Sequence, residues 1–286
     1  MRNENIRSIV RGAYSVQKLR IQAGNRIVAN FKAKLGQEPQ EKEETMDAEG
    51  KFILHQLRAR YQKLMDGLKT FPRQNSYQGD ELISDFTELC LVHQYVGLER
   101  EENEHFRLLG SVLKGYPIYT EFLQDIKGIG PAMAGVIVSE FDPHKSKYPS
   151  SFWKYAGLDV GENGQGLSRK KEHPIETEYV DKDGEVKTKM GITFNPWLKT
   201  KLVGVLGSSF LRAKDSYYGQ VYYNYKARLE NHPAHKEKTK GHRHNMATRY
   251  AVKRFLVDLL RKWRELEGLE VSSEYSEGKL GMEHAR

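Results

Sequence analysis

The sequence FLQDIKGIGPAMAGVIVSEF, residues 122–141, has the pattern of a helix-hairpin-helix. Apolar residues close one predicted helix, Gly128 and Gly130 form the turn, and Pro131 opens the next helix, where its missing N–H is not needed. The amides of such a turn lie at a helix N-terminus, which attracts an anion. The segment therefore predicts a turn that contacts backbone phosphates. A tight interhelical turn that binds nothing is the alternative.

The charge of the chain favours phosphate binding. Its 286 residues include 46 Lys and Arg against 38 Asp and Glu, for a formal net charge of +8. A basic chain suits an anionic polymer as partner, and Lys127 lies in the predicted turn. No apolar run has the length of a membrane span, and the first residues lack the pattern of a signal peptide. We therefore expect a cytoplasmic protein with no membrane partner.

The upstream sequence predicts helices alone. Residues 1–36 form a predicted N-terminal helix with Gly24 as a possible break, and the acidic stretch 37–50 is a predicted linker without a helix cap. Residues 51–117 are predicted to form coiled-coil-like helices. Within them Asp80 is expected to cap a long helix that ends near Gly115.

A narrow apolar seam lies in the first of these coiled-coil-like helices. Its members recur at spacings of three and four and are Ile53, Leu57, Tyr61, Leu64 and Leu68. Such a seam is typical of a coiled-coil hairpin or of a contact between two copies. Because a lone helix with so narrow a stripe buries little area, we expect a homo-oligomer, specifically a homodimer, held by the N-terminal helices.

Residues 118–270 are predicted to form the DNA-binding domain. Period-two alternation on both sides of Asp183 and Gly184 predicts a β-hairpin. Asn195 should cap one helix and Asn245 the last long helix, while residues 271–286 are a predicted disordered tail. The expected fold is mainly α: a helical coiled-coil N-terminal region, then a helical domain with a helix-hairpin-helix and one small β-hairpin.

The order of the motifs is more specific than any one of them. GIGPAMAGVIVSEF is followed by FWKYAGL, a glycine-rich basic loop, FNPWLKTKLVGVLGSSFLRAK and finally GHRHNMATRYAVKRFLVDLLRKWRELEGL. This string, over residues 122–269, resembles the C-terminal transposase domain of the IS-one-ten insertion-sequence family, whose relatives include the pilin-gene invertase and the bridge-RNA-guided recombinases. The upstream helices are similar in kind to the coiled-coil segment that precedes this domain.

The chain departs from this family in two respects. Family members begin with a RuvC-like domain that bears four catalytic acidic residues, and no such pattern is visible here. They also carry a nucleophilic serine a few residues after the AGL motif. The corresponding place in this chain lies near Gln165 and Gly166, where no serine stands. Ser168 is a weak candidate for this role, because it could take it only if the loop has shifted.

Basic and glycine residues are the candidate contacts to nucleic acid. Each phosphate that they neutralise would release a counterion and make binding fall with salt. The candidates are Lys127, Gly128, Ile129, Gly130, Arg169, Lys170, Lys171, Lys199, Lys201, Arg212, Lys226, Arg228, Arg249 and Lys253. Tyr217 and Tyr223 are predicted to point outward and could stack on bases.

Four histidines raise the question of a metal site. They are His232, His235, His242 and His244. Their spacing matches no standard finger and no cysteine supports them, so a solvated basic loop is favoured and no metal is expected.

Three functions remain open. The leading hypothesis is a transposase-derived protein that binds duplex or branched DNA without chemistry of its own and without a cofactor. The alternative is a serine-dependent strand-transfer recombinase that takes Mg²⁺-binding acidic residues from a partner. The third is an assembly protein that binds structured RNA.

Overall fold

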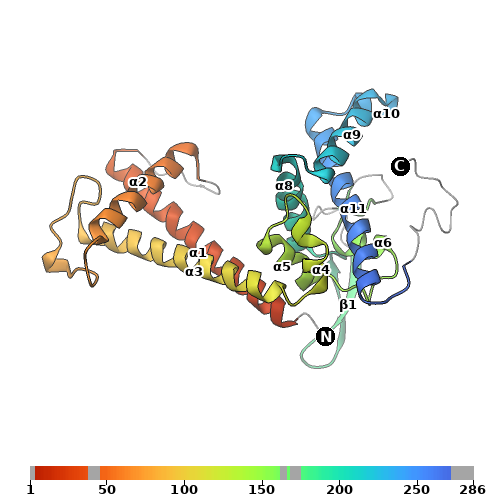
Figure 1. Cartoon of the computed structure of the whole chain (residues 1–286), viewed down its shortest axis with the longest axis horizontal. Helices are drawn as coiled ribbons and strands as arrows, with labels where there is room; N and C mark the ends of the chain where they lie inside the picture. Colours follow the sequence, from red (N-terminus) through yellow and green to blue (C-terminus); the bar gives the residue numbers. More distant parts are fainter. Residues whose placement is uncertain (1–3, 38–45, 162–165, 168–174, 272–286) are drawn as a thin grey trace. The chain divides into compact units, whose positions relative to one another are not determined.

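Helices make up most of the chain (Figure 1). The computed structural model describes residues 4–37, 46–161, 166–167 and 175–271. These residues confirm the expected mainly helical fold with one small β-hairpin. They fall into two compact units, Ser8–Leu108 and Met1–Arg7 with Leu109–Arg286. No helix among them combines the length and the apolar character that crossing a membrane requires.

The Ser8–Leu108 unit is built on three helices. They are α1 (Glu4–Lys34), α2 (Ala48–Met65) and α3 (Phe86–Leu113), with the short 3-10 helix η1 (Gln74–Ser76) between the last two. Their apolar faces share one core, which comprises Ile27, Val28, Ile53, Leu54, Leu57, Tyr61, Ile83, Leu89, Val92 and Tyr95.

The predicted break at Gly24 is wrong, because α1 continues through this residue. A Cβ on Gly24 would lie 3.1 Å from the Tyr95 ring and 3.3 Å from Leu54. The glycine therefore allows its helix to approach these neighbours closely. The linker prediction is also too long: Asp47 accepts a hydrogen bond of 2.6 Å from the Gly50 amide and caps α2. Residues 38–45 of that linker lie outside the described residues.

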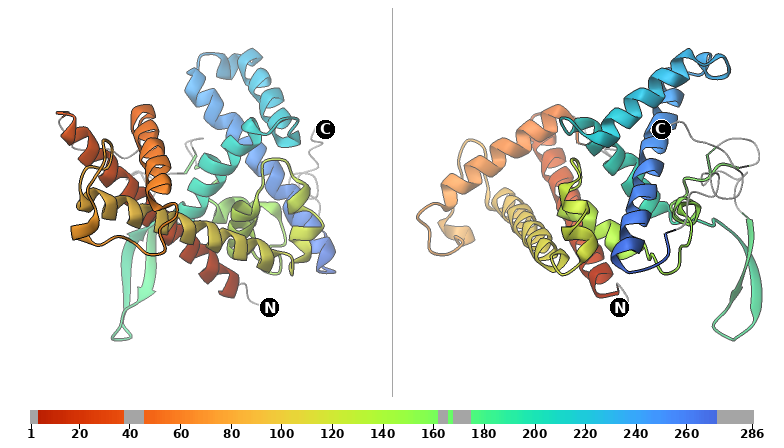
Figure 2. Two further views of the ribbon diagram at one scale, coloured as in Figure 1. Left: turned by 60° about the vertical axis from the view of Figure 1, so that its left-hand side comes forward. Right: turned by 45° about the vertical axis from the view of Figure 1, so that its right-hand side comes forward.

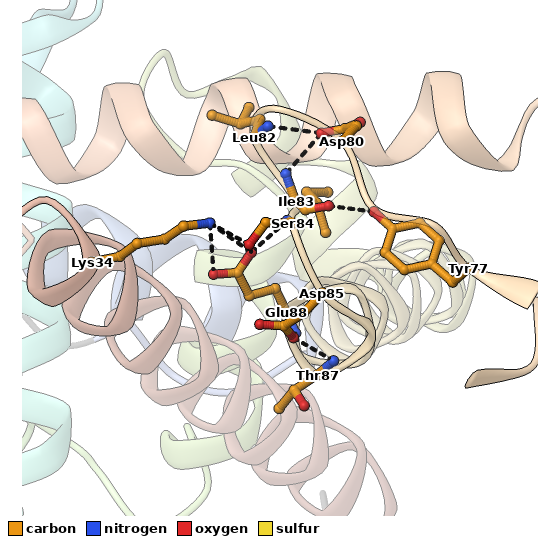
Figure 3. Close-up of polar contacts among 9 residues, drawn as sticks. All are labelled: Lys34, Tyr77, Asp80, Leu82, Ile83, Ser84, Asp85, Thr87 and Glu88. Carbon is orange, nitrogen blue, oxygen red and sulfur yellow. Dashed lines mark hydrogen bonds and ion pairs between the residues drawn. The ribbon is translucent and has the colours of Figure 1, made fainter. Parts of the chain in front are cut away.

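Asp80 does not cap the long helix (Figure 3). Its carboxylate accepts 2.8 Å hydrogen bonds from the amides of Leu82 and Ile83, and so fixes a turn before the helix. The cap of α3 is Asp85, which accepts from the amides of Thr87 and Glu88 at 2.7 and 2.9 Å. Both aspartates match the preference for an N-cap, and the sequence alone does not separate them.

The apolar seam is largely covered by its own chain. Ile53, Leu57 and Tyr61 are buried in the core of the unit, Leu64 packs against that core, and Leu68 remains 52% exposed. The seam therefore needs no second copy to remove its apolar surface from water. Glutamate at Leu57 would place a charge in this core, so it would test folding before it tested association.

The second unit contains the helix-hairpin-helix and everything that follows it. Its first elements are α4 (Pro117–Thr120), η2 (Leu123–Asp125), α5 (Pro131–Glu140) and α6 (Pro149–Tyr155). Strands β1 (Ile175–Val180) and β2 (Val186–Gly191) then pair antiparallel, with Val180 opposite Val186 as the predicted hairpin requires. The helices α7 (Pro196–Lys199), η3 (Thr200–Leu206, a π-helix), α8 (Gly207–Arg212), α9 (Tyr217–Asn231), α10 (Pro233–Lys236) and α11 (Lys240–Leu266) complete it.

Helix α11 supplies much of the core of this unit and packs beside α9 (Figure 2). The residues buried along it recur at helical spacing and include Ala247, Ala251, Phe255, Leu259 and Trp263. The helix begins five residues before the predicted cap, at Lys240. Thr239 accepts the His242 amide at 3.2 Å, so the prediction of Asn245 as cap is wrong.

Candidate nucleic-acid interface

The helix-hairpin-helix turn is tied to the rest of its unit. The helix before the turn is reduced to α4 and the single turn η2. Gly128 has φ of +101°, and a Cβ there would lie 3.1 Å from the Phe210 ring and from the Ser209 backbone. A side chain at Gly128 would therefore be both strained and crowded. The Ile129 amide donates to the Ile126 carbonyl at 3.0 Å, so this amide is already used within the turn.

The surface of the turn is formed by Lys127 and Gly130. Gly130 is exposed and adopts an extended conformation as the N-cap of α5, with open space where a Cβ would lie. The Lys127 side chain is exposed, with its Nζ 3.9 Å from Asp215. The Lys127 carbonyl accepts a 3.3 Å hydrogen bond from Ser216 Oγ. Since an exposed ion pair of this length is weak, Lys127 is available to a phosphate.

Three of the predicted cations come together elsewhere. Lys199 at the end of α7 and Arg249 and Lys253 on α11 surround the segment that follows α6. We refer to these three residues as the cation cluster. Lys199 donates a hydrogen bond to the Leu167 carbonyl. The Arg249 guanidinium lies so close to Gly166 that a Cβ on this glycine would overlap its Nη1 atom.

Local contacts fix the backbone on which the cluster rests. Val160 and Gly166 form an isolated antiparallel bridge, and the Leu167 amide donates to the Asp159 carbonyl at 3.1 Å. Trp153 on α6 donates from Nε1 to the Lys253 carbonyl at 3.3 Å, while the Lys253 ammonium lies 5.0 Å from the centre of the Trp153 ring. The cluster thus joins α6, α7 and α11 around one loop.

The cations of the cluster are partly removed from water. Burial, and next the neighbouring Arg249 guanidinium, lower the pKa of Lys199 to about 8. Burial is also the cause of a lowered pKa for Arg249 and the main cause for Lys253, where Arg249 adds to the lowering and Asp159 opposes it. Arg249 Nε is buried and has no hydrogen-bond partner within the described part of the chain. Such a set of desolvated like charges favours an anion.

No carboxylate among the described residues forms an ion pair with a member of the cluster, although ion pairs are common elsewhere in the chain. The contacts that the cluster does make are to a carbonyl oxygen and to aromatic rings: Lys199 lies 4.9 Å from the centre of the Phe194 ring. The arrangement can therefore bind a phosphate, which would supply the missing counter-charge.

The remaining predicted contacts do not join the cluster. Lys201 lies 5.7 Å from the Trp197 ring centre, Arg212 contacts Ser209 at 3.5 Å, and Lys226 lies 5.9 Å from the Tyr222 ring centre. Their binding to phosphate stays a prediction. Arg228 lines a pocket at the end of α9. Ser168, Arg169, Lys170 and Lys171 lie outside the described residues.

A buried carboxylate that sequence reasoning missed holds these elements together. The Glu140 side chain has no exposed surface and lies at the end of α5. Its Oε2 accepts from Asn195 Nδ2 at 2.8 Å, from Tyr155 OH at 3.2 Å and from Arg7 at 3.3 Å. Asn195 also caps α7 through its Oδ1. Glu140 therefore fixes where α6 and α7 present Trp153 and Lys199.

The four histidines do not form a metal site among the described residues, although the His232 and His235 rings lie 5.1 Å apart. Within the described residues, no three or more His, Cys, Asp or Glu side chains are placed to hold a metal ion. His232 Nδ1 accepts the Ala234 amide at 3.2 Å and caps α10, and His244 pairs with Tyr222 OH at 2.7 Å. Tyr217 and Tyr223 are 66% and 54% exposed, as predicted.

Comparison with known families gives one match to this unit. The family described as Transposase IS116/IS110/IS902 matches residues 120–179, which contain the helix-hairpin-helix turn, α5, α6 and the loop that contacts the cation cluster. No curated protein sequence matches the chain significantly.

Proposed function

We propose that this chain, whose residues 120–179 match the model of the Transposase IS116/IS110/IS902 family, binds the phosphate backbone of duplex or branched DNA through the cation cluster. The helix-hairpin-helix turn adds Lys127 and Gly130 as a second phosphate contact. In this proposal the chain positions DNA and performs no strand transfer on its own.

The observation that carries the proposal is that three half-buried cations lie together and that none of them forms an ion pair with a carboxylate among the described residues, although Asp159 acts on Lys253 from a greater distance. Burying like charges is unfavourable, so a folded protein rarely keeps such a set unless an anion binds it. Phosphate suits the geometry because guanidinium and ammonium donors form charge-assisted hydrogen bonds with it. Because such contacts reach only the backbone of DNA, the affinity should be similar for duplexes of any base sequence.

Substitution of Gly166 by alanine tests the position of Arg249. The backbone of Gly166 lies outside the left-handed region, but a Cβ would overlap the guanidinium of Arg249. The arginine must move, so we expect duplex affinity to fall about 5-fold with little change in melting temperature. Gly204→Ala is the matched control because a Cβ there meets open space. Equal affinity of Gly166→Ala and wild type would show that Arg249 does not contact DNA.

Duplex affinity should also fall as the pH rises from about 7 to about 9. The pKa of Lys199 is lowered to about 8 in the free protein. Phosphate binds the protonated amine. Above about pH 8 the free protein has lost this proton and must take it up again to bind DNA, so we expect duplex affinity to fall about 10-fold. The measurement is fluorescence anisotropy at constant ionic strength. Lys199→Gln should remove most of this pH dependence; an identical pH profile in the variant would contradict the role of Lys199.

One observation favours the recombinase alternative. Lys199 is bound to the carbonyl of Leu167, the residue that precedes Ser168 in sequence, and an amine with a pKa of about 8 can accept a proton from a serine hydroxyl. The Mg²⁺ ligands of such a reaction would come from another polypeptide. A covalent adduct with nicked DNA in the presence of Mg²⁺, lost in Ser168→Ala, would establish this alternative in place of the proposal above.

Two further predictions of the sequence belong with this proposal. Structured RNA remains an alternative partner, and comparing copurifying nucleic acid before and after ribonuclease treatment separates it from DNA. A homodimer through the N-terminal helices also stays a prediction. Light scattering of the wild-type protein tests it, and a monomer at micromolar concentration would refute it.

A further inference from the structure

A pocket lies where α9, α10 and α11 meet, apart from the residues of the cation cluster. Its volume is about 290 Å³. It is lined by Tyr225, Arg228, Leu229, His232, His235 and Tyr250. Ligand pockets in proteins begin at about this size, so it suits a small group such as one nucleotide and is too small for a duplex.

Two tyrosines form the aromatic wall of the pocket. The rings of Tyr225 and Tyr250 are stacked in parallel, with centroids 4.0 Å apart and planes at 8°. Tyr250 is 37% exposed. A stacked pair of this kind offers its outer ring face to a further planar group, as aromatic side chains do for bases in proteins that bind single strands.

Polar groups complete the lining. Arg228 is exposed and supplies a guanidinium for a phosphate. His232 and His235 both line the pocket, with ring centroids 5.1 Å apart, and their imidazoles offer polar groups to the edge of a ligand. His232 uses its Nδ1 as acceptor for the Ala234 amide, which places the hydrogen of its neutral ring on Nε2. The pocket thus combines an aromatic face, a cation and imidazole groups.

We propose that this pocket binds one unpaired nucleotide of a nucleic-acid strand. The base stacks on Tyr250, its polar edge meets the histidines, and the phosphate contacts Arg228. This goes beyond the proposed function, because the cation cluster holds backbone phosphates of any duplex, whereas this pocket requires a base that has left its pair. DNA and RNA share this chemistry, and the probes below distinguish them.

The test uses the full chain and three probes: single-stranded DNA and RNA of about five nucleotides each, and a perfect duplex. Tyr250→Leu should weaken binding of a single-stranded probe about 10-fold and leave duplex affinity within about 2-fold. Arg228→Gln alters an exposed side chain, so it provides a second variant that does not depend on the tyrosine stack. The matched control is Tyr179→Leu, which removes a tyrosine of similar exposure, 39%, from strand β1 and should change neither affinity.

Failure of this proposal is distinct from failure of the proposed function. Lys199→Gln should weaken duplex binding more than Tyr250→Leu does, and should weaken binding of the short strands less than Tyr250→Leu does. The pocket is excluded if Tyr250→Leu and Arg228→Gln both leave the binding of the single-stranded probes unaffected, or if Tyr179→Leu weakens it as much as Tyr250→Leu does. If the pocket variants lose affinity for only one of the two single-stranded probes, that probe identifies DNA or RNA as the ligand. If they lose affinity for both, the pocket binds the chemistry that DNA and RNA share.

Discussion

The triple variant Lys199→Gln, Arg249→Gln, Lys253→Gln is expected to bind duplex DNA on the order of 100-fold more weakly than the wild-type protein at moderate salt. Each substitution removes one charge while it keeps much of the side-chain volume. The loss should be similar for unrelated duplex sequences, because the cluster is proposed to contact phosphates. Fluorescence anisotropy with two duplexes of different sequence measures both expectations.

A control for net charge is available in the other unit. Lys51, Lys63 and Lys69 are exposed, and their substitution by Gln removes the same three charges. We expect this control to lose less than about 3-fold in affinity, since it changes only the long-range field. An equal loss in the two triple variants would mean that overall charge, and not the cluster, governs binding.

Glu140→Ala is expected to lower the free energy of unfolding of the second unit by roughly 3 kcal/mol. The substitution leaves Tyr155 OH and Asn195 Nδ2 without their carboxylate acceptor at the buried junction of α5, α6 and α7. A loss of this size should lower the melting temperature of a unit of this length by about 10 °C. Urea denaturation followed by circular dichroism and intrinsic fluorescence gives the measurement.

Two comparisons sharpen this prediction. Glu140→Gln keeps an acceptor oxygen, so it should lower the free energy of unfolding by about half as much as Glu140→Ala does. Glu185→Ala removes a carboxylate with 70% exposure from the hairpin turn and should change stability by less than about 0.5 kcal/mol. If Glu140→Ala unfolded at the same urea concentration as Glu185→Ala, the proposed junction would be refuted.

Local signals in the sequence predicted much of the fold. The glycines and proline of the turn, the alternation of the hairpin and the Asn195 cap each depend on a few neighbouring residues, and each lies where it was expected. Errors occurred where two residues of similar preference compete. Asp80 and Asp85 both have the side chain of a good N-cap. Ile83 packs into the core between them, and the helix starts only after Asp85.

The interface depends on contacts that the sequence does not encode locally. Lys199, Arg249 and Lys253 were each predicted to contact nucleic acid. No local signal in the sequence indicates that residues 50 positions apart lie beside the same loop. Gly166 was considered only as a place for a serine, whereas its small size makes room for Arg249. Glu140 was missed because a single glutamate at a helix end normally indicates a solvated residue. Its burial follows from tertiary packing.

The most direct test of the cation cluster is the salt dependence of duplex binding. The affinity of the wild-type protein and of the Lys199, Arg249 and Lys253 triple variant is measured over a range of NaCl concentrations. If all three residues neutralise phosphates, log K falls linearly with log salt, and the slope for the triple variant is smaller in magnitude by roughly 2 to 3. Equal slopes for the two proteins would contradict the cluster as the DNA-binding site.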